Sequence, residues 1–135
     1  MLFGDEHVRR YEETDGEVGY DWQNGAPVLI LTTTGRKTGQ PRKSALIFQE
    51  VDGAYVVVAS KGGADDHPAW YLNLRDNPEV AVQVKADRFP ARARTARDDE
   101  KAALWPRMTK VWPSYDDYQR KTERDIPVVV LERVG

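Results

Sequence analysis

Residues 31–47 read LTTTGRKTGQPRKSALI, with apolar and β-branched residues near both ends and two glycines and a proline in the middle. Runs of this kind predict two strands joined by a tight turn, here strands over 27–34 and 42–51. The turn carries four cations, Arg36, Lys37, Arg42 and Lys43. Because the chain as a whole has a formal net charge of -2, any site for an anion must be local to this turn.

The 135 residues fit one domain with one hydrophobic core. Cysteine is absent, which excludes disulfides, thiolate metal sites and cysteine nucleophiles and fits a cytoplasmic protein. The two histidines, His7 and His67, lie far apart in the sequence, so we expect no metal site. No apolar run has the length of a signal peptide or of a membrane-spanning helix, which needs about 20 apolar residues.

The rest of the chain shows short strands separated by turns. Further strands are predicted over 54–60, 79–86, 88–95 and 126–134, and helices over 67–78, 98–112 and 114–122. Asp66 and Ser114 are the expected N-caps of two helices. Residues 1–21 form a loosely attached arm, in which 3–14 could fold as a short helix. Hairpin connections without βαβ alternation predict a mainly β domain with flanking helices (α+β) over 22–135, whose antiparallel sheet curls into a barrel.

The basic turn has two interpretations, which the residues alone leave open. A solvated hairpin tip would use its cations to keep the strand edge from pairing with other chains. An anion pocket would use backbone N–H groups that Gly35 and Gly39 allow to converge, with arginine and lysine as charged partners. The Walker A spacing is absent, because Gln40 stands where its second glycine would be, so nucleotide hydrolysis is not indicated.

Two later segments carry further candidate residues. In ASKGGADDHPAWYLNL (59–74), Lys61 ends a strand, and Trp70 and Tyr71 are either core residues or the wall of a site for a flat ring. In WPSYDDYQRKTERDIP (112–127), two tyrosines three residues apart share a helix face. That spacing suits either packing under the barrel or a slot with phenolic hydroxyls.

Segments 27–47, 56–84 and 112–133, in this order, resemble the deazaflavin-dependent nitroreductases of actinobacteria, within the wider flavin and deazaflavin oxidoreductase superfamily. The resemblance spans residues 22–134. It implies a split β-barrel of the FMN-binding type and, as cofactor, reduced coenzyme F-420. This 8-hydroxy-5-deazaflavin has a lactyl-phosphate and polyglutamate tail, which the basic turn would hold.

The resemblance also implies roles for individual residues. Those that would contact the cofactor are Arg36, Lys37, Thr38, Arg42, Lys43, Ser44, Ala45, Leu46, Ile47, Val58, Ala59, Ser60, Lys61, Ala69, Trp70, Tyr71, Leu72, Asn73 and Tyr115. Those that would face the ring and the acceptor, as catalytic candidates, are Tyr115, Ser60 and Tyr118. No protein nucleophile is needed, because the cofactor supplies the hydride and the protein positions the reactants.

The implied function is hydride transfer from reduced coenzyme F-420 to an electron-poor acceptor such as a quinone, an activated enone or a nitroaromatic. Two alternatives stay open: an FMN-binding split-barrel oxidoreductase, and a non-catalytic module that carries a deazaflavin or a lipid. Nucleic acid is not an expected partner, since few aromatic residues interleave with the cations and the net charge is negative. A homodimer and a peripheral contact with the inner membrane face are compatible with the resemblance. Trp112, where the family can hold a tyrosine, would narrow the site against bulky nitroimidazoles.

Overall fold

The computed structural model describes residues 4–134, with only the backbone of Asn24. Its helices are α1 (Gly4–Glu13), α2 (Ala69–Asp76), α3 (Asp98–Val111) and α4 (Ser114–Lys121), with short 3-10 turns η1 (Gln23–Gly25) and η2 (Lys61–Gly63). Its strands are β1 (Val28–Thr34), β2 (Pro41–Ile47), β3 (Gln49–Val51), β4 (Ala54–Val58), β5 (Glu79–Val84), β6 (Asp87–Thr95) and β7 (Val128–Arg133).

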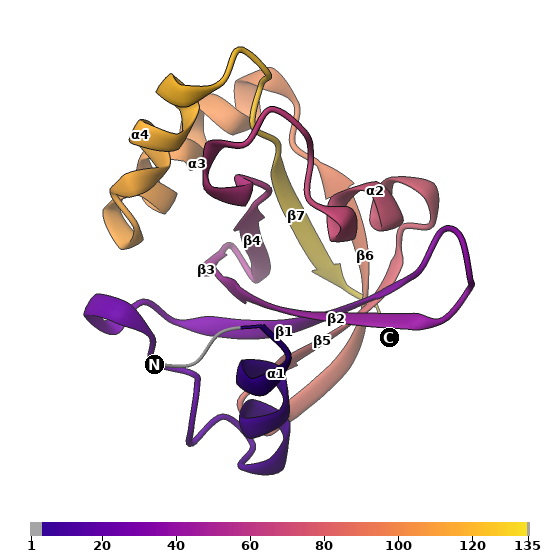
Figure 1. Ribbon diagram of the computed structural model, residues 1–135. Helices are drawn as coiled ribbons and strands as arrows, with labels where there is room; N and C mark the ends of the chain where they lie inside the picture. Colours follow the sequence, from indigo (N-terminus) through magenta and orange to yellow (C-terminus); the bar gives the residue numbers. More distant parts are fainter. Residues whose placement is uncertain (1–3, 135) are drawn as a thin grey trace.

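The strands form one seven-stranded sheet in the order β2-β1-β5-β6-β7-β4-β3, and every pairing is antiparallel. The two edge strands, β2 and β3, follow each other directly in the chain and are joined at Phe48. The chain therefore brings the two edges of the sheet together, and the sheet curls into a half-barrel (Figure 1). The predicted antiparallel split barrel is confirmed.

Phe48 explains why the single strand predicted over 42–51 is two strands. Its side chain is buried in the barrel, and its N–H donates to the carbonyl of Pro27 at 3.1 Å. After this residue the chain leaves β1 and pairs with β4 instead. One strand thus becomes two because its second part changes partner.

Apolar side chains lie on both faces of the curled sheet. The inner cluster is built on residues such as Leu29, Leu31, Val57 and Leu131, all fully buried. A second cluster lies between β4, β7 and the helices α3 and α4, with Met108 fully buried at its centre. Figure 1 shows α3 and α4 on one side of the β1–β2 hairpin and α1 on the other.

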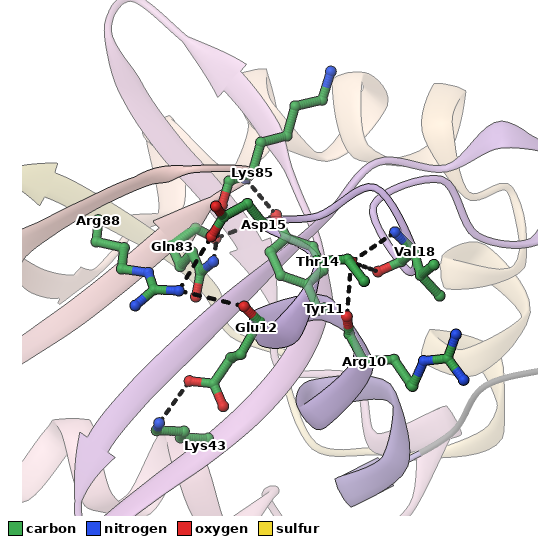
Figure 2. Close-up of polar contacts among 10 residues, drawn as sticks. All are labelled: Arg10, Tyr11, Glu12, Thr14, Asp15, Val18, Lys43, Gln83, Lys85 and Arg88. Atoms are coloured by element: carbon green, nitrogen blue, oxygen red, sulfur yellow. Dashed lines mark hydrogen bonds and ion pairs between the residues drawn. The ribbon is translucent and has the colours of Figure 1, made fainter.

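Helix α1 packs firmly on the outer face of β1 and β2, so the expectation of a loosely attached arm is wrong. Val8 and Tyr11 join Val28 and Ile30 in a third apolar cluster, and Tyr11 is 0% exposed. The Tyr11 hydroxyl accepts the Lys85 N–H at 2.7 Å (Figure 2). The sequence did not predict this packing, because only a few residues on the sheet-facing side of the helix are apolar. Residue 3, where the predicted helix begins, lies outside the described residues.

Both N-caps expected from the sequence are wrong. Pro68 precedes α2 and Pro113 precedes α4, and neither helix has a side-chain cap. The Asp66 carboxylate pairs instead with the Lys61 ammonium at 3.0 Å, and Ser114 is already the first residue of its helix. Proline suits the start of a helix because its missing N–H would have no helical partner there.

Candidate functional site

A cleft of about 560 Å³ lies where β2, the end of β4, η2, α1 and α4 meet. Its lining residues are Gly4, Asp5, His7, Val8, Trp22, Val28, Lys43, Ser44, Ala45, Leu46, Ile47, Val58, Ser60, Lys61, Gly62, Pro68, Trp70, Trp112, Tyr115 and Tyr118. The cleft therefore joins all three sequence segments that carry the predicted site residues.

The floor of the cleft is the open edge of β2. The Gly35 N–H donates to the Gln40 carbonyl, and the Phe48 N–H donates to the Pro27 carbonyl. These two bonds show which residue pairs of the β1–β2 ladder are hydrogen-bonded to each other. Because hydrogen-bonded pairs alternate in an antiparallel ladder, the backbone groups of residues 43, 45 and 47 point away from β1. A row of backbone donors and acceptors thus faces the cleft between mostly apolar side chains.

One wall of the cleft is aromatic and comes from α4 and the end of α3. Tyr115 is 4% exposed, and its ring lies 6.1 Å from that of Tyr118 in an edge-to-face arrangement. The Trp112 indole N–H donates to the Tyr118 hydroxyl at 3.3 Å. The Tyr115 hydroxyl has no hydrogen-bond partner within residues 4–134, and burial raises the pKa of this tyrosine well above its ordinary value. It is therefore a protonated donor at the cleft surface.

The opposite wall comes from α1 and the segment after it. The Trp22 ring stacks on that of Trp112 across the cleft, with ring centroids 5.4 Å apart and planes at 27°. His7 is buried behind Trp22, and its Nε2 lies 2.8 Å from the Gly19 carbonyl. Glycine is required at position 19 because a Cβ there would lie 2.9 Å from the imidazole Cδ2.

Two lysines bring positive charge to the cleft, and each already has a carboxylate partner. The Lys43 ammonium lies 2.6 Å from the Glu12 carboxylate of α1 (Figure 2). Lys61 pairs with Asp66, and this hydrogen bond holds the pKa of the Asp66 carboxyl below its ordinary value. Both ion pairs are solvent-accessible and therefore contribute little free energy. A bound anion could replace either carboxylate as the partner of the lysine at a small cost in free energy.

The basic turn projects beyond the cleft. Its predicted ligands Arg36, Lys37, Thr38 and Arg42 are exposed and are not lining residues. Asn73 of α2 anchors the turn, since its Oδ1 accepts both the Arg36 N–H, at 3.2 Å, and the guanidinium, at 2.9 Å. The Asn73 amide in turn donates to the Thr33 hydroxyl at 3.2 Å.

The remaining predicted residues divide between cleft and core. Those that line the cleft are Lys43, Ser44, Ala45, Leu46, Ile47, Val58, Ser60, Lys61, Trp70, Tyr115 and Tyr118. Ala59, Tyr71 and Asn73 are buried in the protein, and the Tyr71 hydroxyl lies 2.9 Å from that of Thr95. Ala69 and Leu72 belong to α2 but are not lining residues.

Sequence reasoning did not find Trp22, His7 and Arg124 as parts of the site. Trp22 and His7 enter through the packing of α1, which no local pattern indicated. Arg124 supports the cleft from outside its lining, because its guanidinium donates to backbone carbonyls on both sides of η2. An arginine in an otherwise charged segment (KTERDIP) looks the same in sequence whether it is solvated or holds a loop.

The lining suits a planar heteroaromatic group with a polar edge and an anionic extension. The β2 edge offers hydrogen bonds in a line, the tyrosine and tryptophan rings offer flat apolar surface, and the two lysines bring positive charge to the lining. Within the described residues, no group of three His, Cys, Asp or Glu side chains could hold a metal ion. No helix there has the length and apolar character to span a membrane.

Comparison with known proteins places the chain in a family. A family model described as F420H(2)-dependent quinone reductase matches residues 4–133. The F420H(2)-dependent quinone reductase Rv1261c of Mycobacterium tuberculosis is 41% identical over 130 residues, 94% of this chain and 87% of the relative.

Two solved structures share both fold and sequence with this chain. One, described as F420-H2 dependent reductase FDR-A, has a TM-score of 0.73 and 41% identity, covering 78% of this chain and 94% of the other. A second, described as a domain-swapped dimer, has a TM-score of 0.76 and 38% identity, covering 93% and 96%. The resemblance read from the sequence is confirmed, and this chain belongs to the F420H(2)-dependent quinone reductase family.

Proposed function

We propose that this reductase binds reduced coenzyme F-420 along the edge of β2 and passes reducing equivalents to a quinone in the same cleft. When bound, the reduced deazaflavin supplies a hydride to the acceptor. The observation that carries the proposal is the meeting of three features in one cleft: a line of β2 backbone groups directed away from β1, a tyrosine hydroxyl with no hydrogen-bond partner among the described residues, and two lysines.

The edge of β2 would hold the cofactor ring. Backbone groups of Lys43, Ala45 and Ile47 are directed at the cleft and would bond the polar edge of the heterocycle. Leu46 and Val58 add apolar surface beside it. Binding by backbone groups on a strand keeps the ring in one position, which is what hydride transfer requires of the protein.

The cations would hold the tail. Lys43 and Lys61 lie in the cleft, and the tip with Arg36, Lys37 and Arg42 lies further along the same hairpin. A phosphate followed by several carboxylates is long enough to reach from the lysines to the tip, whereas a single phosphate would engage one group only. Trp70 of α2 lines the cleft and would flank this path.

Tyr115 is our candidate for the group that bonds the acceptor oxygen. Its hydroxyl is protonated at neutral pH and has no hydrogen-bond partner among the described residues, so it is available to a quinone carbonyl. Ser60 lies between β4 and η2, lines the same cleft, and would orient a water that delivers a proton. Tyr118 accepts from Trp112 and thereby fixes the aromatic wall.

Activated enones and nitroaromatics stay candidate acceptors, because each also presents an oxygen that accepts a hydrogen bond. A homodimer is our expected assembly, supported by the relative described as a domain-swapped dimer. Peripheral membrane contact is a prediction motivated by lipid-soluble quinones alone.

The test is a fluorescence titration with oxidised coenzyme F-420 at two salt concentrations, with FMN as competitor, followed by an assay with reduced cofactor and menadione. We expect tight binding that weakens with salt, no displacement by equimolar FMN, and menadione reduction. Preferential FMN binding would move the protein to the flavin-binding group. Cofactor binding without turnover of any quinone, enone or nitroaromatic would make it a carrier.

A further inference from the structure

The connection from β4 to α2 has an unusual backbone. Lys61, Gly62 and Gly63 have φ values of 46°, 63° and 85°, so three consecutive residues lie in the left-handed region. Glycine adopts this region freely, but lysine does so rarely because its Cβ crowds the backbone. The surrounding structure must therefore hold Lys61 in place.

Arg124 is the residue that spans this turn. Its Nη2 donates to the Ser60 carbonyl at 2.8 Å and its Nη1 to the Ala59 carbonyl at 3.2 Å, both before the turn. Its Nε donates to the Ala64 carbonyl at 2.7 Å, directly after the turn. One planar guanidinium thus fixes the entry and the exit of the turn, which a lysine ammonium with its single nitrogen cannot reproduce.

Neighbouring contacts hold both the arginine and the turn. The Gln119 amide donates to the Arg124 carbonyl at 2.8 Å, and the Thr122 hydroxyl donates to the Asp65 carboxylate at 2.9 Å. Gly63 lies against α4 so closely that a Cβ there would meet the Tyr118 carbonyl oxygen at 2.7 Å. The turn is therefore clamped between α4 and the segment before β7.

We infer that Arg124 is a positioning residue, whose guanidinium fixes the left-handed turn that presents Ser60, Lys61 and Gly62 to the cleft. The inference rests on the proposed function for the identity of the ligand, but the conformation of the turn can be measured without any ligand. Arg124 lines no part of the cleft itself. It acts through the carbonyl groups on both sides of the turn.

His67 makes this clamp dependent on pH. Its Nδ1 lies 3.2 Å from Arg124 Nη1, and it accepts this hydrogen bond only when the imidazole is neutral. The charged groups around the ring are Arg124 and Asp66 beside it and Arg75 on α2, and the Tyr71 ring packs on it at 4.8 Å. Burial, and then the two arginines, lower the pKa of His67 below its ordinary value of 6.5.

The sign follows from this direction. A histidine with a lowered pKa in the folded protein contributes its full stability above the unfolded pKa of 6.5 and loses it as pH falls through the folded value. The clamp is therefore complete at neutral pH and loses its His67 contact in acid, where a third positive charge joins Arg124 and Arg75.

The experiment compares wild type with Arg124→Gln, Arg124→Lys and the matched control Arg120→Gln, an exposed arginine of α4 that pairs only with Asp117 in the described structure. Tryptic cleavage after Lys61 in the absence of ligand reports the turn, and fluorescence titration with oxidised coenzyme F-420 reports the cleft. We expect Arg124→Gln to speed cleavage and raise Kd by about tenfold each, since several charge-assisted hydrogen bonds are lost. The Arg120→Gln control should match wild type.

Arg124→Lys covers the case in which Arg124→Gln fails to give a native circular dichroism spectrum. The lysine keeps the charge but loses the fork, so a smaller change in the same direction is expected. Folded Arg124 variants with wild-type cleavage and wild-type Kd would overturn the inference. If wild type itself fails to bind coenzyme F-420, the proposed function fails, and the cleavage rates still decide the role of Arg124.

His67→Gln tests the pH dependence, because glutamine keeps an acceptor near Arg124 and does not titrate. The ratio of wild-type Kd to His67→Gln Kd, measured at pH 5.5 and 7.5, cancels any titration of the ligand. We expect this ratio to rise several-fold on acidification. A ratio that stays constant would remove the pH dependence from the clamp.

Discussion

Tyr115 has a buried ring and a hydroxyl at the cleft surface, which suits it to bond a reacting oxygen rather than to stabilise the fold. Burial raises the pKa of this tyrosine, so the hydroxyl stays protonated across the physiological range. We predict that Tyr115→Phe lowers kcat by about 10- to 100-fold and leaves the Kd for coenzyme F-420 unchanged. Steady-state rates with menadione from pH 6 to 9 check this.

The control for Tyr115 is Tyr118→Phe, which keeps the ring but loses the hydroxyl that accepts from Trp112. We expect a smaller effect on kcat there. Wild-type turnover by Tyr115→Phe at every pH would show that this hydroxyl takes no part in catalysis.

Lys61 is a cation of the cleft whose electrostatic effect on cofactor binding can be measured by changing the salt concentration. We predict that Lys61→Ala raises the Kd for coenzyme F-420 about threefold to tenfold at low ionic strength, and less at high ionic strength, because mobile ions screen exposed charges. Titrations at 20 and 500 mM salt check this, with Lys110→Ala on the exposed part of α3 as control. Parallel salt dependences for the Lys61 variant and wild type would exclude an electrostatic role.

At the residue scale, the family resemblance implied site roles for the run 43–47, Ser60, Lys61 and Tyr115, and all of these residues line the cleft. Local spacing could not indicate Arg124, because the backbone carbonyls that accept from its guanidinium lie 60 to 65 residues away. Nor could local spacing show that the Asn73 side chain accepts a hydrogen bond from Arg36, which lies 37 residues earlier in the chain. Such contacts depend on how the sheet curls, which no local spacing specifies.

At the scale of elements, α1 is a wall of the site as well as a cover for the sheet. Its Tyr11 hydroxyl accepts the Lys85 N–H at 2.7 Å, and the ring is fully buried. We predict that Tyr11→Phe costs about 1–3 kcal/mol in the free energy of unfolding, because the Lys85 N–H loses its partner. Urea denaturation at pH 7.5 measures this cost.

The same tyrosine predicts a loss of stability in alkali. Burial raises the pKa of Tyr11 from 10.0 to about 12, so the folded state retains a proton that the unfolded state releases. Stability from this group is therefore full below pH 10 and falls as pH rises toward 12, by about 2–3 kcal/mol in total. The Tyr11→Phe variant should lack this part of the alkaline loss. Identical pH profiles for wild type and variant would contradict the assignment.

Elements were easier to predict than their ends and their partners. The apolar, β-branched run of 27–34 and the alternating side chains of 79–86 and 88–95 predicted strands, because both patterns are local properties of the sequence. The two predicted N-caps are wrong because prolines precede α2 and α4. The carboxylate expected to cap α2, that of Asp66, forms an ion pair with Lys61 instead. A proline inside a helix usually breaks or kinks it, yet α3 continues through Pro106 over Asp98–Val111. Packing of Met108 and its neighbours against the sheet offsets the lost backbone hydrogen bond.

At the scale of the whole molecule, the site exists because segments from both ends of the chain meet on one strand edge. α1 approaches β2 from one side, and α3 and α4 approach from the other (Figure 1). The stacked rings of Trp22 and Trp112, with centroids 5.4 Å apart, form a contact between these two sides. This stacked pair therefore limits the space that a bulky acceptor would have in the cleft.

This pair predicts the size of acceptor that the enzyme accepts. We predict that Trp112→Tyr and Trp22→Ala each raise kcat/KM for a bulky acceptor, such as a bicyclic nitroimidazole or a long-chain naphthoquinone, about tenfold relative to menadione. Removing part of a wall changes discrimination between acceptors by about 1–3 kcal/mol. Trp105→Phe is the control, because Trp105 lies on α3 outside the cleft lining. Equal changes for bulky and small acceptors would show that the pair supports the fold of the cleft and does not select its substrate.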